Sequence, residues 1–291
     1  MMPFRMLVVV VLPLMHATVG TAMEPTLRDV TYAVVDGHEL KLDLYLPGAN
    51  ESKDAAPLIV WVHGGAWRAG SKASVPILDL VSAGFAIASV DYRLSTEAPF
   101  PAQVHDIKAA IRFLRHHAAD YQLDADRFSL TGASAGGHLA ALTGVSANVA
   151  ELEGKVGEHL QERSDVGHIV SFYGASNLQT ILSQSTPHGL SVRVPALTLL
   201  LGGPPEDRTE LLRLASPVVH VDKHDPPLLL IHGDQDPQMP INQSHELFGR
   251  YTKLGLTAEF DVVYGGAHGG PEFYSEDRLR RVAAFLNDNP K

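Results

Sequence analysis

The sequence predicts an α/β fold with a mostly parallel sheet and helices on both faces. Segments with strand-like and helix-like periodicity alternate along the chain, which is typical of such sheets. Several of the apolar runs are continuous, as in strands that are covered on both sides. The 291 residues are 45% hydrophobic and 19% charged, so one large globular domain is expected.

The elements follow one another in a regular order. Residues 30–35 and 40–46 flank Asp36-Gly37 with alternating polarity, which indicates an antiparallel hairpin. Between core strands, residues 174–226 are predicted to form an inserted cap with a short amphipathic helix at residues 206–214. The other expected strands span residues 58–62, 85–90, 127–130, 169–173, 228–231 and 258–263, and the expected helices span residues 107–117, 135–144, 241–254 and 275–286.

The N-terminus has the outline of a secretory signal peptide. Arg5 precedes an apolar run at residues 6–15, and small residues follow through Ala22. The run is too short to span a bilayer comfortably. We therefore expect cleavage after Ala22, export of residues 23–291 as one domain, and no stable membrane anchor.

Composition excludes several kinds of site. The formal net charge of -10 argues against nucleic acid or an anionic membrane as the main partner. The chain has no cysteine, which excludes disulfides, thiolate metal sites and thiol nucleophiles. The histidines lack the spacing of zinc ligands. No metal and no other cofactor is expected.

A nucleophile elbow is indicated by Gly132-Ala133-Ser134-Ala135-Gly136, which joins an apolar run to a helical pattern. A serine on a sharp strand-to-helix turn needs nearly side-chain-free neighbours two residues before and after it. Gly132 and Gly136 meet that need. The N–H of Ala135 would then lie at a helix N-terminus, where negative charge is favoured.

Candidate partners for Ser134 follow later strands. Asp234 and Asp236 come after the run at residues 228–231, and His268 lies in a glycine-rich loop after the run at residues 258–263. A nucleophilic serine needs a base, and the base needs an orienting carboxylate. We prefer Asp236 as the acid. Asp234 is the alternative acid, and its expected role is otherwise to make hydrogen bonds within the loop.

These motifs together resemble the α/β-hydrolases of the carboxylesterase and acetyl-xylan or feruloyl esterase type, which are related to hormone-sensitive lipase. The resemblance covers the chain after the leader and implies Asp236 as the acid and the N–H groups of Gly64, Gly65 and Ala135 as the oxyanion hole. Ala66 departs from the third glycine of many relatives, so a changed loop shape is expected. The motifs are His63-Gly64-Gly65-Ala66-Trp67, Asp91-Tyr92-Arg93, Gly132-Ala133-Ser134-Ala135-Gly136-Gly137-His138, His232-Gly233-Asp234-Gln235-Asp236 and Gly265-Gly266-Ala267-His268-Gly269.

Other motif residues are expected to have structural roles. His63 is expected to hold the loop that carries Gly64 and Gly65, and His138 is expected to pack behind the elbow. Asp91 and Arg93 are expected to form an ion pair below the site. Trp67 has two interpretations, a wall of the substrate pocket or core packing.

The expected function is hydrolysis of short-chain acyl esters, including acetyl or feruloyl esters of carbohydrates, through an acyl-enzyme on Ser134. One alternative is an arylformamidase-like amide hydrolase, since His63-Gly64-Gly65-Ala66-Trp67 also resembles the motif of those enzymes; export argues against it. A prolyl-oligopeptidase-like peptidase would need room for a propeller domain. A non-catalytic hydrolase-fold binding module usually lacks a triad residue, and this sequence has all three.

Overall fold

A computed structural model describes residues 23–48 and 54–288 of the chain. The predicted signal peptide, residues 1–22, lies outside these described residues. Among the described helices, none is both long enough and apolar enough to cross a membrane.

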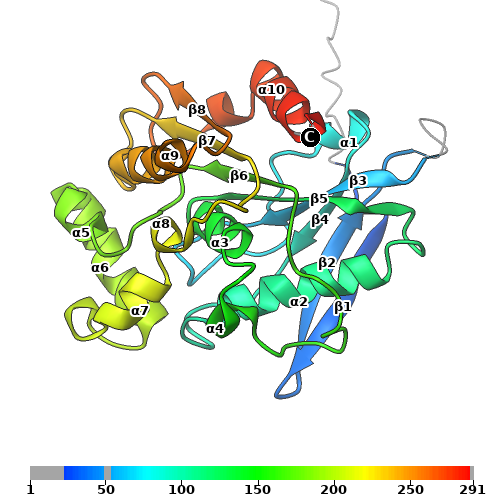
Figure 1. Ribbon diagram of the computed structural model, residues 1–291, viewed down its shortest axis with the longest axis horizontal. Coiled ribbons are helices and arrows are strands. Elements are labelled where there is room, and N and C mark those ends of the chain that lie inside the picture. Colours follow the sequence, from blue (N-terminus) through cyan, green and yellow to red (C-terminus); the bar gives the residue numbers. More distant parts are fainter. Residues whose placement is uncertain (1–22, 49–53, 289–291) are drawn as a thin grey trace, which may run out of the picture.

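One eight-stranded sheet crosses the molecule in the order β1-β2-β4-β3-β5-β6-β7-β8 (Figure 1). The predicted hairpin is its edge, where β1 pairs with β2 and β2 with β4 in antiparallel fashion; all later pairs are parallel. The prediction of a mostly parallel sheet is therefore confirmed. The strands are β1 (Leu27–Val35), β2 (His38–Tyr45), β3 (Ala56–Val62), β4 (Ala86–Val90), β5 (Leu123–Ala133), β6 (His168–Phe172), β7 (Leu228–Gly233) and β8 (Ala258–Val263).

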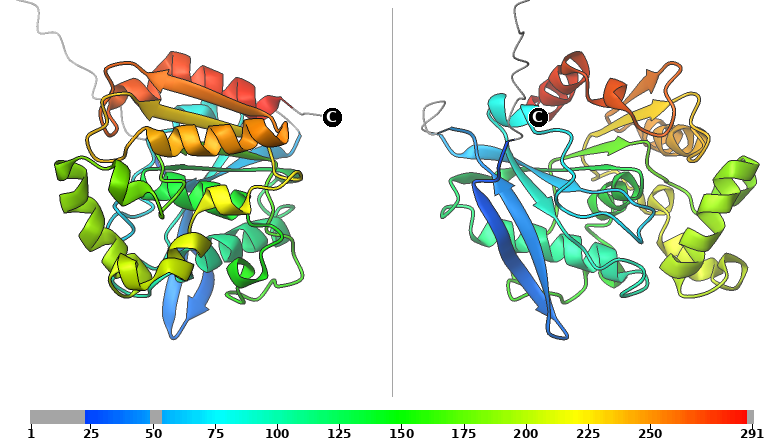
Figure 2. Two further views of the ribbon diagram at one scale, coloured as in Figure 1. Left: turned by 60° about the vertical axis from the view of Figure 1, so that its left-hand side comes forward. Right: turned by 180° about the vertical axis from the view of Figure 1, so that it is seen from behind.

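Helices cover both faces of the sheet, which Figure 2 shows from two further sides. On one face lie α2 (Ala102–His116), α3 (Ala135–Gly144) and α9 (Asn242–Leu254), together with the short α4 (Ala150–Glu153). The other face carries α1 (Asp79–Ser82), the 3₁₀ turn η2 (Pro271–Tyr274) and α10 (Glu276–Asn287).

The buried residues form two hydrophobic cores, one on each face. Strand β3 contributes to both because its side chains alternate: Leu58, Val60 and Val62 join the core beneath α2 and α3, whereas Ile59 and Trp61 join the core beneath α10. A continuous apolar strand is thus the sequence pattern that two-sided burial requires.

The segment between β6 and β7 is more helical than the sequence suggests. It contains α5 (Ile181–Gln184), α6 (Pro187–Leu201), η1 (Pro205–Asp207), α7 (Thr209–Leu214) and α8 (Pro217–His220). The helix predicted at residues 206–214 corresponds to η1 and α7, but the longer α6 was not expected. We call residues 174–226 the insertion; its helices α5 to α7 lie at the left of Figure 1.

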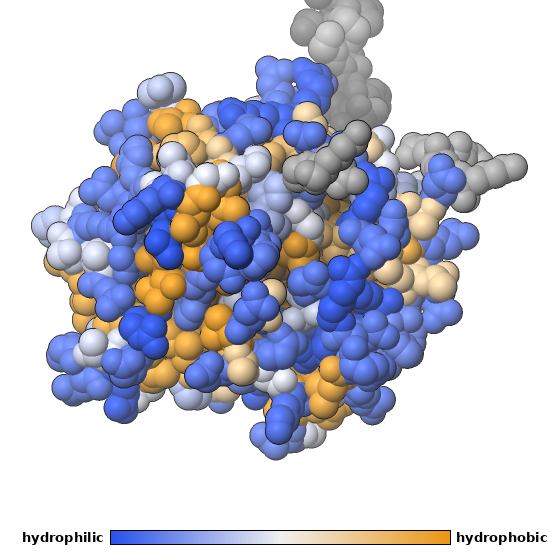
Figure 3. Space-filling view, viewed as in Figure 1, coloured by the Kyte–Doolittle hydropathy of each residue, from blue (hydrophilic) through white to orange (hydrophobic). Residues whose placement is uncertain are grey.

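The surface over this region is mixed in character. Figure 3 shows hydrophobic residues interspersed with hydrophilic ones, with the larger hydrophobic areas over the left-hand part, where the insertion lies. Val194 and Leu199 of α6 are among the exposed large hydrophobic residues, 42% and 38% exposed.

The expected ion pair between Asp91 and Arg93 is wrong. Arg93 instead binds Asp106 of α2, with Nη2 2.7 Å from Oδ1, and Oδ1 of Asp91 accepts the backbone N–H of Lys72 at 2.7 Å. Arg93 therefore connects the segment after β4 to α2, whereas Asp91 connects it to the loop that contains Lys72.

Candidate active site

Ser134 lies on a strained turn between β5 and α3. Its backbone angles are φ 55° and ψ -116°, a region that costs a non-glycine residue free energy. The turn is closely packed: a Cβ on Gly132 would lie 2.4 Å from the carbonyl oxygen of Gly136, and a Cβ on Gly136 would lie 2.0 Å from that of Val62. The glycines predicted for an elbow are therefore required by sterics.

Three side chains from separate loops form one hydrogen-bonded chain. Oγ of Ser134 lies 2.8 Å from Nε2 of His268, and Nδ1 of His268 lies 2.6 Å from Oδ2 of Asp236. Since a carboxylate only accepts, Nδ1 of His268 carries the proton and Nε2 is free to accept from the serine hydroxyl. The residues follow β5, β8 and β7, at the strand ends where such sheets bind ligands.

Asp236 is held as an anion although its side chain is only 1% exposed. Burial opposes ionisation, but hydrogen bonds from His232 and His268 and from the N–H of Met239 hold the pKa of its carboxyl well below the usual range. Oδ1 also accepts the N–H of Gln238 at 2.8 Å. By contrast, Asp234 accepts the N–H of Gly265 at 2.7 Å, which is the loop role considered for it.

The loop after β3 lies beside the nucleophile. A Cβ on Gly64 would be 3.4 Å from Cβ of Ser134, and Gly65 has a φ of 113°. Within the described part of the chain, the N–H groups of both glycines donate no hydrogen bond to the protein. The N–H of Ala135, at the first position of α3, has no intrahelical acceptor. These three N–H groups thus have no acceptor within the described residues, and Gly64 and Gly65 line the same pocket as Ser134.

His63 supports this loop from below, as expected. Its Nδ1 lies 2.7 Å from the carbonyl oxygen of Gly64, and its ring stacks on Tyr92 with the centroids 4.4 Å apart. The Tyr92 hydroxyl donates to the carbonyl of His63 at 3.1 Å. Ala66 and Trp67, which follow Gly65 in the same loop, have positive φ values of 52° and 60°. Ala66 thus takes the left-handed conformation that glycine adopts more easily.

Trp67 does not line the pocket, so its interpretation as a pocket wall is wrong. It is fully buried, and its Nε1 donates to Nδ1 of His138 at 3.1 Å, while Nε2 of His138 donates to the carbonyl of Ala215 in the insertion at 2.7 Å. Burial lowers the pKa of His138 to about 4, so this imidazole is neutral. Trp67 and His138 together connect the loop after β3 to the insertion through α3.

A pocket of about 550 Å³ opens over Ser134 and His268. Sequence reasoning missed most of its polar wall. Tyr173, directly after β6, packs its ring edgewise on His268 with the ring centroids 4.9 Å apart. Its hydroxyl oxygen lies 2.6 Å from that of Tyr274. Its position at a strand end was a usable signal. Arg193 and Gln238 complete this polar wall.

Arg193 comes from α6 and is 2% exposed. Its Nη2 donates to the carbonyl of Gln238 at 3.0 Å, and its guanidinium lies 5.8 Å from the centroid of the Trp67 ring. Its Nε is buried and has no hydrogen-bond partner in the described part of the chain. Burial lowers the pKa of Arg193 to about 10, so the group remains a cation at neutral pH.

The family is decided by a match along most of the chain. The sequence model of the BD-FAE family matches residues 42–251, a span that includes the loop after β3, Ser134 and Asp236. The chain belongs to the BD-FAE family. This confirms the resemblance to carboxylesterases with the α/β-hydrolase fold.

Two curated esterases of Mycobacterium tuberculosis are similar to this BD-FAE chain. Esterase LipQ of Mycobacterium tuberculosis is 28% identical over 87% of the chain and 59% of its own length. Esterase LipC of the same organism is 32% identical over 80% of the chain and 58% of its own length. The chain thus spans a little under 60% of these curated relatives.

Solved structures share the fold. A truncated carbohydrate esterase from gut microbiota has a TM-score of 0.80 and 35% identity, with 89% of this chain and 94% of that chain covered. A thermophilic esterase from Thermogutta terrifontis, Est2 with bound propionate, has a TM-score of 0.73 and 27% identity, with 90% and 94% covered.

Proposed function

We propose that this chain is a serine carboxylic ester hydrolase that acts on short-chain acyl esters of carbohydrates through an acyl-enzyme on Ser134. The observation that carries the proposal is the hydrogen-bonded chain from Ser134 through His268 to the anionic Asp236. Esterases and carbohydrate esterases among the similar proteins support the same reaction class.

The first half of the reaction follows from this geometry. Oγ of Ser134 attacks the ester carbonyl while its proton moves to Nε2 of His268, and Asp236 stabilises the imidazolium that forms. The N–H groups of Gly64, Gly65 and Ala135 receive the developing oxyanion. Each donor of this kind contributes about 2.7–4 kcal/mol to lowering the barrier.

The leaving alcohol takes the proton from His268, and the acyl group remains on Ser134. A water molecule then gives a proton to His268 and attacks the acyl carbon. As the bond to Oγ of Ser134 breaks, His268 returns that proton to Oγ, which releases the acid and restores the serine. No metal or organic cofactor has a role in these steps.

Polar groups in the pocket support a polar substrate. The guanidinium of Arg193 supplies a charged donor, and Gln238 lies next to it. Sugar hydroxyls and carboxylates accept from such donors, whereas a long acyl chain does not. Acetyl and feruloyl esters of plant polysaccharides fit this chemistry, and we assign the insertion, residues 174–226, the role of a cap that contributes Arg193.

Export completes the proposal. The leader at residues 1–22 would be removed after Ala22, which leaves residues 23–291 as the active domain. N-terminal sequencing of the protein recovered from outside the cytoplasm tests this point separately from the catalysis.

The catalytic proposal is tested by a substrate panel. We expect turnover of p-nitrophenyl acetate that falls as the acyl chain lengthens, release of acetate from acetylated xylan or of ferulate from methyl ferulate, and no turnover of N-formylkynurenine. Folded Ser134→Ala should lose the activity. Preference for N-formylkynurenine, or near-full activity of Ser134→Ala, would contradict the proposal.

A further inference from the structure

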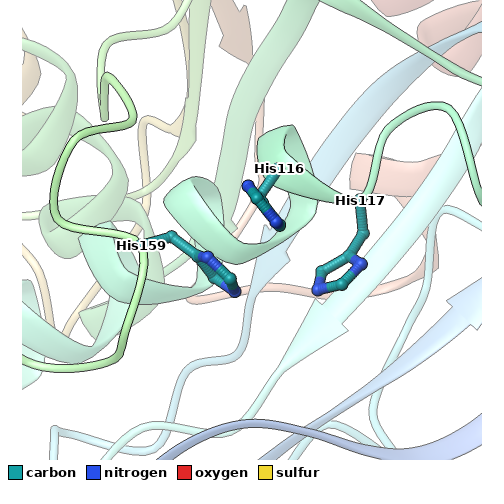
Figure 4. A group of neighbouring side chains, drawn as sticks. All are labelled: His116, His117 and His159. Carbon is teal, nitrogen blue, oxygen red and sulfur yellow. The ribbon is translucent and has the colours of Figure 1, made fainter.

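Three histidines that are distant from the pocket lie together on the surface. His116 ends α2, His117 follows it, and His159 belongs to the loop between α4 and β6. One nitrogen from each ring lies within 4.8 Å of the other two. Figure 4 shows a nitrogen of each ring directed toward the space between them.

Two of the rings are oriented by carboxylates. Nδ1 of His117 lies 2.9 Å from a carboxylate oxygen of Asp120, and Nδ1 of His116 lies 3.3 Å from one of Glu162. When Nδ1 donates to a carboxylate, Nε2 is the nitrogen left with a free lone pair. Metal-binding histidines in proteins commonly have this arrangement, which fixes the tautomer and makes the ligand nitrogen more basic.

His159 completes the cluster and has no competing partner. Its ring stacks on that of His116 with the centroids 3.9 Å apart and stands edgewise to His117 at 5.3 Å. Neither of its ring nitrogens has a hydrogen-bond partner in the described part of the chain.

We propose that His116, His117 and His159 form a binding site for a divalent transition metal ion, with zinc as the best match. Three neutral imidazoles are a donor set that zinc accepts, with a water molecule in the fourth position. Tetrahedral zinc–nitrogen bonds of about 2.0–2.1 Å would require the three nitrogens to draw closer together and the stacked rings of His116 and His159 to tilt apart. His116 and His117 are 41% and 30% exposed, so their side chains have room to rotate.

The site would fasten a loop to a helix rather than take part in the reaction. None of the three histidines lines the pocket over Ser134. The same loop is already bound to α2, where Arg115 donates to the carbonyls of Arg163 and Asp165 and Arg112 to that of Val156. A bound ion would add a cross-link beside these contacts and stabilise the folded chain.

Sequence spacing did not reveal this site because His159 lies far from the histidine pair along the chain. The expectation of no metal rested on local spacing alone. Only the packing of the loop against the end of α2 brings the third ligand to the other two.

The test compares zinc binding by the tag-free protein and three variants. Isothermal titration with ZnCl2 should show one more zinc ion per chain in the wild type than in His159→Gln. Glu162→Gln, which alters only the carboxylate behind His116, should bind this ion about tenfold more weakly. His224→Gln, at an exposed histidine elsewhere, should match the wild type. Zinc on His268 would occur in all four proteins and cancel in the comparison.

Two further measurements keep the result decisive. Hydrolysis of p-nitrophenyl acetate without added metal should be equal in the wild type and His159→Gln, which shows that the variant is folded. Zinc should raise the thermal midpoint of the wild type but not of His159→Gln. Equal zinc stoichiometry and equal thermal response in the two proteins would overturn the proposal.

Discussion

Nε2 of His232 lies 3.3 Å from Oδ2 of Asp236. The same nitrogen lies 3.0 Å from the carbonyl oxygen of Met239, and Nδ1 lies 2.7 Å from the hydroxyl of Ser244. A carbonyl oxygen can only accept, so Nε2 carries the proton. This fully buried ring therefore donates to the oxygen that also receives the hydrogen bond from His268, and it helps to hold the Asp236 carboxylate in place.

Replacement of His232 should slow catalysis without weakening substrate binding. In His232→Leu, Asp236 loses a donor and the pKa of its carboxyl rises, so it orients His268 less firmly. We expect kcat to fall roughly tenfold, which corresponds to about 1.4 kcal/mol in the barrier, with KM unchanged. His232→Gln, which retains a donor, should recover part of the loss. An unchanged kcat in folded His232→Leu would show that the contact serves only packing.

Arg193 should matter for carbohydrate esters more than for simple ones. Arg193→Met removes the charged donor from the pocket but retains most of the side-chain volume. We expect KM for acetylated xylo-oligosaccharides to rise by about tenfold, the effect of losing about 1.4 kcal/mol of binding, and the kinetics on p-nitrophenyl acetate to change little. Arg213→Met, at an exposed site of the same insertion, is the matched control. Equal losses on both substrates would assign Arg193 a structural role.

The stability of the fold should decline in acid through His138. Its pKa is about 4 in the folded protein because of burial, against about 6.5 in the unfolded chain. The unfolded state therefore takes up the proton first as the pH falls. The contribution of His138 to the free energy of unfolding should be constant above about pH 6.5 and decrease between about pH 6.5 and 4, by up to about 3 kcal/mol.

Urea unfolding of His138→Gln measures this effect. Glutamine can accept from Trp67 and donate to Ala215, but it does not titrate. The variant should lose less stability than the wild type between pH 7 and pH 5, whatever its stability at pH 7. Parallel losses in both proteins would assign the acid sensitivity to other groups.

Replacement by alanine should destabilise the protein at the closely packed Gly136 of α3 and stabilise it at the open Gly249 of α9. A Cβ on Gly136 would lie 2.0 Å from the carbonyl oxygen of Val62, whereas a Cβ on Gly249 of α9 would meet nothing within 4 Å. The yield of soluble, active protein should therefore be much lower for Gly136→Ala than for the wild type. In Gly249→Ala the free energy of unfolding should rise by about 0.5–1 kcal/mol, since glycine is a poor helix former. A fully active Gly136→Ala would mean that the elbow tolerates a wider turn.

Much of the site could be predicted from the sequence because its residues lie where strands end. Ser134, Asp236 and His268 each follow an apolar run, and parallel strands bring such ends to one edge of a sheet. The preference for Asp236 over Asp234 also agrees with the structure, in which only Asp236 contacts His268.

The insertion could not be predicted to the same depth. Helix α6 is apolar on most of its surface and contains Pro195, so it carries neither the amphipathic period nor the unbroken run that identifies a helix from sequence. Arg193 therefore had no predicted element, and its place in the pocket follows from tertiary packing alone. The sequence also left open whether Trp67 lines the pocket or packs in the core, because its contact with His138 is long-range.

Two elements in particular are longer in the structure than the sequence predicts. Strand β5 extends from Leu123 to Ala133, beyond the expected residues 127–130, because Thr131, Gly132 and Ala133 pair with β3 or β6 despite their small size. Helix α2 begins at Ala102, directly after Pro101, where the polar Gln103 and Asp106 obscure the helical period.

The claim that Ser134 is the activated nucleophile is tested most directly by mapping a fluorophosphonate adduct. The intact mass of the wild-type chain should increase by one adduct, and peptide mapping should place it on Ser134. His268→Asn should react much more slowly, and Ser134→Ala not at all. An adduct on another residue, or equal labelling of Ser134→Ala, would contradict the account.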